Sequence, residues 1–134
     1  MKQGIQTYFP HEMLRRNGAY FFCLLRWAEL ITSKDFTVAD IIKIYEDAVK
    51  AEFINKHVFI LSAAQLLNLM IASDSFTRIR IITKVPNQQR YLIYLEKPGS
   101  GHFVLHDDGK IWDPLDPKRP EAVGYNHVSY REIT

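Results

Sequence analysis

Two residues in the second half of the sequence, His102 and Asp113, have side chains that can together move a proton. They flank the dipeptide Asp108-Gly109, which is typical of a two-residue β-hairpin turn. Such a turn places position 104 opposite position 113, with His102 diagonal to Asp113 on one face of the sheet. A carboxylate held there fixes the tautomer of the imidazole and leaves its second nitrogen as a general base. A three-residue turn with a bulge would shift the register and separate the two side chains.

Each of these residues also has an ordinary explanation. A single histidine at the start of a strand is more often a surface or capping residue, and an aspartate before a proline, as in Asp113-Pro114, commonly begins a turn. The remaining histidines show no metal-ligand spacing, and the chain has no glycine motif for a nucleotide. We therefore expect neither a metal nor a cofactor.

A second position of chemical interest is the start of a helix predicted from about Gly18 to Ser33. Asn17 is suited to be its N-cap, and Gly18 allows a sharp bend of the entering chain. The helix is apolar on nearly every side, which predicts a place in the middle of the core. Its free N–H groups and the positive end of its dipole favour an anion, such as a thiolate or an oxyanion. The residue at this position is Ala19.

The single cysteine, Cys23, lies one full turn inside the same helix. There the effect of the dipole has decayed, and the amide of Cys23 is used in the helix ladder. A buried cysteine behaves as a small hydrophobic residue, so we interpret Cys23 as part of the core. Thiolate formation there would require a basic neighbour.

Helical patterns fill the first half of the chain, and strand patterns fill the second. Thr37 and Asp40 form an acidic version of a capping box before an amphipathic surface helix, and Ser62 precedes a third helix that reaches Ile71. Strands are predicted at 78–83, 90–95, 102–106, 110–113 and 123–128. This order predicts an α+β fold, in which N-terminal helices with a buried central helix pack on a C-terminal antiparallel sheet.

Composition limits the remaining possibilities. With 134 residues and 47% apolar content, the chain fits one domain over residues 1–134. Its net charge is +2 and its basic residues are scattered, so we expect no nucleic-acid partner. No apolar run approaches the roughly 18 residues of a membrane span. A lone cysteine excludes an internal disulfide, and without an export signal the expected location is cytoplasmic.

The order of these parts resembles the papain-like cysteine peptidase fold, and within it the compact, C39-like branch of bacteriocin-leader peptidases. In that branch a cysteine begins the central helix, a histidine opens a strand and an Asp-Pro supplies the acid. His102-Phe103-Val104-Leu105 and Asp113-Pro114-Leu115 match the second half of this pattern. The stretch from Asn17 to Glu29 is also similar to the opening of a small bacterial and phage family that has Gly-Cys-Tyr-Phe there.

The resemblance implies a papain-like fold and a Cys-His-Asp site that hydrolyses or transfers acyl groups. Position 19 would be the nucleophile, His102 the base and Asp113 its orienting acid, with the N–H of residue 19 as one oxyanion donor. The usual second donor is a glutamine about six residues earlier, where this chain has Met13. Asn17, Gln6 or a backbone amide are the substitutes. Cys23 is the alternative nucleophile.

Ala19 is the main departure from that pattern, and the chain as written is inactive in acyl transfer. Two explanations compete: an engineered Cys→Ala substitution, and a natural pseudoenzyme that binds a protein, for instance a phage-encoded module directed at a host or defence protein. No acidic or basic rim is evident in the sequence. A peptide, an isopeptide or a small amide therefore all remain open as substrates.

Overall fold

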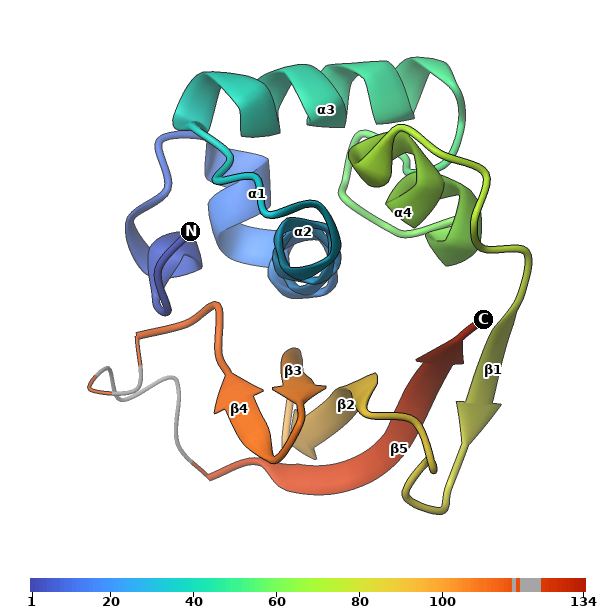
Figure 1. The fold of residues 1–134 in the computed structure, drawn as a ribbon. Coiled ribbons are helices and arrows are strands. Elements are labelled where there is room, and N and C mark those ends of the chain that lie inside the picture. Colours follow the sequence, from blue (N-terminus) through green and yellow to red (C-terminus); the bar gives the residue numbers. More distant parts are fainter. Residues whose placement is uncertain (117, 119–123) are drawn as a thin grey trace.

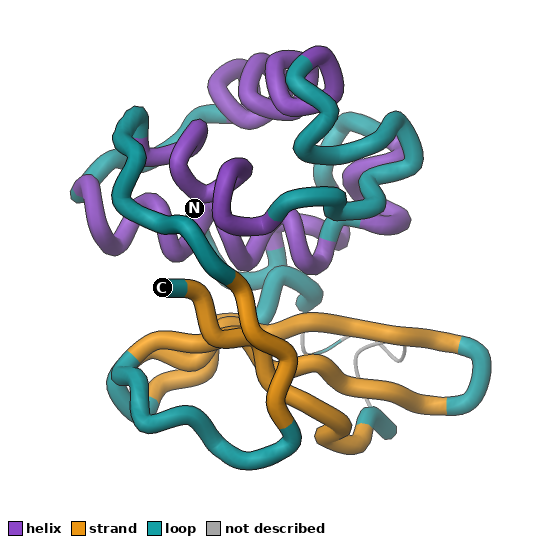
Figure 2. Tube along the Cα trace, turned by 90° about the vertical axis from the view of Figure 1, so that its right-hand side faces the viewer, coloured by secondary structure: helices purple, strands orange, loops and turns teal. Residues whose placement is uncertain are grey.

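A computed structural model describes residues 1–116, 118 and 124–134 and shows an α+β fold, as the sequence predicts (Figure 1). The helices are η1 (Ile5–Tyr8), α1 (Glu12–Asn17), α2 (Ala19–Thr32), α3 (Val38–Lys50) and α4 (Ala63–Ile71). The strands are β1 (Ile79–Ile82), β2 (Arg90–Lys97), β3 (Ser100–Asp107), β4 (Lys110–Trp112) and β5 (Asn126–Ile133). The helices form one layer and the antiparallel sheet forms the other (Figure 2).

Helix α2 lies at the centre of the molecule, between α3 and the sheet (Figure 1). Phe21, Phe22, Leu24 and Leu25 are fully buried, and the helix contacts both α4 and β3. The all-round apolar pattern therefore predicted its place correctly, because a helix without a polar face has no favourable position at the surface.

The junction between α1 and α2 corrects one prediction. Asn17 is the last residue of α1, and Gly18 takes the N-cap position of α2. The prediction of Asn17 as N-cap was wrong because the preceding residues continue a helix through Asn17. A Cβ atom on Gly18 would lie 2.3 Å from the carbonyl oxygen of Leu14, so the close approach of the two helices requires glycine there.

The predicted capping box at the start of α3 is confirmed. The Thr37 hydroxyl accepts from the backbone N–H of Asp40 at 3.1 Å, and the Asp40 carboxylate accepts from the N–H of Thr37 at 3.0 Å. Ser62 is the N-cap of α4, as predicted, but its side chain makes no capping hydrogen bond.

The sheet has the strand order β1-β5-β2-β3-β4. Between β3 and β4, Asp108 and Gly109 form the predicted two-residue turn with φ of 49° and 82°, and Asp107 pairs with Lys110. The last strand is displaced from the prediction. β5 covers Asn126–Ile133 and lies between β1 and β2, and Val123 of the predicted strand lies outside the described residues.

Within the described ranges, none of the helices has the length and apolar character to cross a bilayer.

Candidate functional site

His102 and Asp113 form a short polar contact next to the start of α2. The imidazole Nε2 lies 2.7 Å from Oδ1 of Asp113, and His102 is only 2% exposed. Because a carboxylate only accepts, Nε2 carries a hydrogen and, in the neutral ring, Nδ1 keeps its lone pair. The hairpin geometry inferred from the Asp108-Gly109 turn therefore brings these two side chains together.

Asp113 is itself held in place by its own turn and by the start of the chain. Its Oδ1 also accepts from the backbone N–H of Leu115 at 2.9 Å. Four hydrogen bonds join residues 3–7 to residues 113–116: Asp113 N to Gln3 Oε1 (3.2 Å), Gly4 N to Asp113 O (2.9 Å), Gln6 N to Pro114 O (2.9 Å) and Asp116 N to Thr7 Oγ1 (2.8 Å). The sequence analysis missed this contact. Its one local signal is Gly4, which has a positive φ of 84°.

The first turns of α2 lie directly against β3 beside His102. The Tyr20 and Phe103 rings are 4.4 Å apart, and the thiol of Cys23 donates to the carbonyl oxygen of Phe103 at 3.5 Å. The first hydrogen bond of the helix runs from Phe22 N to Gly18 O at 2.8 Å. The N–H of Ala19 precedes it and has no partner within the helix, as at every helix start.

Ala19 and His102 line one cleft of about 1270 Å³, which we call the central cleft. Gln6 and Asn17, the two side chains considered as oxyanion donors, line it as well. Asp113 contacts His102 but is not among the lining residues. The lining also includes residues of the loop before α4 and of β1, namely Val58, Phe59, Ile60, Leu61, Ile79 and Ile81. The fold thus brings four of the predicted site residues to one surface.

Gln6 and Asn17 differ in how they are held. Gln6 is 3% exposed and donates from Nε2 to the carbonyl oxygen of Arg15 at 3.1 Å, while its Oε1 has no partner among the described residues. Asn17 is exposed and donates from Nδ2 to the carbonyl oxygen of His57 at 3.3 Å. Of the two amides, Gln6 is the one fixed inside the cleft wall.

Cys23 is fully buried, and its environment suppresses thiolate formation. Burial is the main cause that raises the pKa of this thiol, and the negative charge of Asp113 raises it further. Burial also raises the pKa of Tyr20, against the opposing effect of the positive charge of Arg131. Both side chains are therefore neutral at physiological pH.

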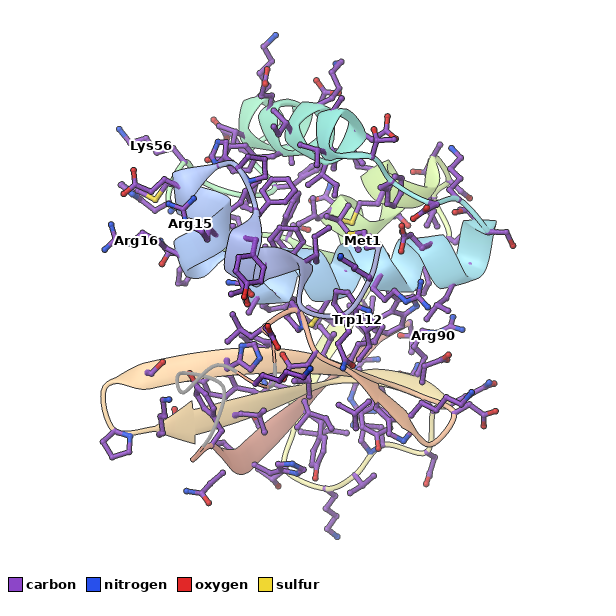
Figure 3. All side chains as sticks on the ribbon, turned by 90° about the vertical axis from the view of Figure 1, so that its left-hand side faces the viewer. Met1, Arg15, Arg16, Lys56, Arg90 and Trp112 are labelled. Carbon is purple, nitrogen blue, oxygen red and sulfur yellow. The ribbon has the colours of Figure 1, made fainter. Side chains whose placement is uncertain are left out.

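Sequence reasoning missed the arginines of the central cleft. Arg131 of β5 is half-buried, its guanidinium lies 5.4 Å from the ring centres of both Tyr94 and Phe103, and Nη1 donates to Ser129 Oγ at 2.8 Å. Arg15 and Arg16 line the cleft near Asn17. Figure 3 shows them with Lys56 at one end of the helical layer. Basic residues that are scattered in the sequence thus meet on one surface.

Among the described residues, no group of three His, Cys, Asp or Glu side chains is placed to hold a metal ion.

A family model described as "Protein of unknown function, DUF261" matches residues 2–132. Comparisons with curated proteins and with solved structures gave no match.

Proposed function

We propose, from the geometry of the site, that the chain is a papain-like cysteine peptidase or amidase domain with Ala19 at the nucleophile position. The chain belongs to the DUF261 family, whose model matches residues 2–132. The observation that carries the proposal is that His102, whose imidazole lies 2.7 Å from Asp113, lines the same cleft as the start of α2. A histidine with one nitrogen fixed by a carboxylate, on the same cleft as a helix N-terminus, is an arrangement that can activate a thiol.

With cysteine at position 19, the chemistry follows from these contacts. His102 Nδ1 takes the thiol proton, and the thiolate attacks the carbonyl carbon of an amide. The N–H of residue 19 donates to the resulting oxyanion. The imidazolium then returns its proton to the leaving nitrogen as the C–N bond breaks, and water hydrolyses the acyl-thioester, which restores the thiol. Asp113 stabilises the imidazolium throughout.

Gln6 is the better candidate for the second oxyanion donor. Its amide is buried in the cleft wall and anchored by the carbonyl of Arg15, which leaves the second hydrogen of Nε2 for a ligand. Asn17 is exposed, and its amide is engaged with the loop at His57. Preorganised donors contribute most when they need no rearrangement in the transition state.

Cys23 is disfavoured as the nucleophile. It has no solvent-exposed surface, its thiol is bonded to the Phe103 carbonyl, and burial raises its pKa. An acyl group could not reach this sulfur without opening the core between α2 and β3.

The alternative is a protein-binding module that keeps the site without its chemistry. Ala19 itself favours this function, because its methyl group cannot form an acyl-enzyme. Phe59, Leu61 and Ile81 are 67%, 56% and 67% exposed on the cleft wall and would contact a bound chain. In this case the substrate pocket would hold a partner, for instance a host or defence protein, and release it unchanged.

The test compares the rates at which iodoacetamide alkylates the variants Ala19→Cys and Ala19→Cys/His102→Ala at neutral pH. We expect Ala19→Cys to react about tenfold faster or more than the double variant, since the imidazole raises the thiolate fraction. Ala19→Cys/His106→Ala is the matched control. His106 lies on the same strand, but it contacts Gln89 and Tyr91 and should not affect the rate.

Equal rates in all three variants would contradict the peptidase proposal. A binding module is instead supported if Ala19→Cys reacts no faster than an ordinary surface thiol, while the chain as written retains a protein partner through the central cleft.

A further inference from the structure

The charged side chains of the central cleft all have the same sign. Arg15, Arg16 and Arg131 line it, and no Asp or Glu is among the described lining residues. For a chain with a net charge of only +2, this is an uneven distribution. A cleft of one sign with apolar walls attracts ligands of the opposite charge.

Arg131 differs from the other two arginines in being held over two aromatic rings, whereas Arg15 donates to the Phe9 carbonyl at 3.1 Å and Arg16 pairs with Glu12 at 3.4 Å. The Arg131 guanidinium lies over the rings of Tyr94 and Phe103, 5.4 Å from each ring centre, and Nη1 donates to Ser129 Oγ. None of the ion pairs among the described residues includes Arg131, so most of its five donors remain for a ligand. A planar guanidinium held in this way suits bidentate binding of a carboxylate.

Arg131 lies between the reactive end of the cleft and its apolar wall. On one side, Phe103 contacts Tyr20, the residue after Ala19. On the other side, Arg131 pairs across the sheet with Ile81 of β1. A ligand that extends from position 19 over Arg131 therefore continues onto Ile81, Ile79 and the exposed Phe59 and Leu61.

The size of the cleft favours an extended ligand. Its volume of about 1270 Å³ exceeds the roughly 300–1,000 Å³ that is usual for a small-molecule site. A single small amide would leave most of these walls in water, whereas several residues of a peptide would cover them.

We propose, on the basis of the function above, that the central cleft takes an extended peptide segment in which an acidic side chain near the scissile amide binds Arg131 and apolar side chains cover Ile81 and Phe59. Arg15 and Arg16, which line the cleft near Asn17, add long-range attraction for an acidic chain. The substrate class is thus an acidic peptide segment of a protein, rather than an isolated small amide.

The test uses the chain as written, so it does not depend on catalysis. Fluorescein-labelled peptide sets carry one fixed Glu, or one fixed Gln, among randomised Leu, Ala and Ser, and binding is followed by anisotropy. We expect Glu sets to bind about tenfold tighter than matched Gln sets, the effect of a hydrogen bond to a charged group. The preference should disappear in Arg131→Gln.

Arg80→Gln is the matched control. Arg80 is an exposed arginine of β1 that pairs with Glu132 and does not line the cleft, so this variant should keep the preference. If Arg131→Gln unfolds, Arg131→Lys is used instead. It keeps the charge but loses the fork geometry, and we expect it to reduce the preference.

Three results would overturn the proposal: equal binding of Glu and Gln sets, a preference that survives in Arg131→Gln, or stronger competition by a single-stranded oligonucleotide than by any Glu set. If the Glu preference is absent while His102-dependent alkylation of Ala19→Cys holds, the acidic substrate is wrong and the peptidase site stands. If the Glu preference is present while alkylation of Ala19→Cys does not depend on His102, the cleft binds acidic peptides and the peptidase site is wrong.

Discussion

Ala19 and Cys23 lie one turn apart on α2, yet their surroundings differ in every respect that matters to a thiol. Position 19 lines the central cleft, and its N–H has no partner within the helix. Position 23 is fully buried against the backbone of β3. The chain therefore has its thiol where burial suppresses ionisation, and a methyl group where the helix start and His102 would promote it. On the proposed function, the reactivity of a thiol on α2 depends on its place along the helix.

The strongest test of this contrast compares two proteins that each have one thiol: the chain as written, and Ala19→Cys/Cys23→Ala. We expect native alkylation to be about a hundredfold faster or more at position 19, because labelling of Cys23 requires local opening of the core that costs several kcal/mol. The measurement is the rate of reaction with iodoacetamide, followed by mass spectrometry. In strong denaturant the two rates should converge. A native rate at Cys23 close to that at position 19 would show that the two places are equivalent.

The second test concerns the helix start itself. Gly18→Ala should lower the free energy of unfolding by about 3 kcal/mol, since the new Cβ would lie 2.3 Å from the Leu14 carbonyl oxygen and force α1 and α2 apart. Urea unfolding measures this change.

Gly99→Ala is the control for that substitution. Gly99 has a φ of 76°, but no atom lies within 4 Å of the place that a new Cβ would take, so only backbone strain applies and a loss of about 1 kcal/mol is expected. Equal losses at the two glycines would mean that close packing does not fix the start of α2.

The smallest effect is the response of Cys23 to alkaline pH. Burial raises its pKa above the ordinary value of 9.0, so the folded protein keeps a proton that the unfolded chain releases. The stabilisation is complete below pH 9 and is lost as the pH rises above it, by about 1.4 kcal/mol at pH 10. Cys23→Ala should therefore flatten the fall in unfolding free energy between pH 8 and 10.5. Identical slopes in both proteins would show that this thiol ionises as easily when folded, contrary to its burial.

Local signals predicted those parts of the fold that local geometry decides. Thr37 and Asp40 were recognised as a capping box because both partners lie within one turn. Asp108-Gly109 set the β3–β4 register, since a two-residue turn leaves no freedom in pairing. The contact of His102 with Asp113 was predicted from that register, and the hydrogen bonds of Asp113 with Gln3 and Leu115 hold it in place.

Contacts between distant segments could not be predicted in the same way. The dipeptide Asn17-Gly18 is compatible with either the start or the end of a helix. In the structure, Asn17 is the last residue of α1. The last strand was displaced because pairing of β5 with β1 and β2 sets its limits. The same strand pairing places Arg131 at the central cleft. No residue spacing in the sequence predicts this position.

The hydrogen bonds between residues 3–7 and 113–116 link positions as much as 110 residues apart. On the ribosome, Gln3 and Gly4 emerge long before Asp113 is synthesised. Until residue 116 has been added and these hydrogen bonds have formed, His102 has no fixed carboxylate partner, and its ring can adopt either tautomer. The hydrogen bond between His102 and Asp113 is therefore among the last contacts of the fold to form.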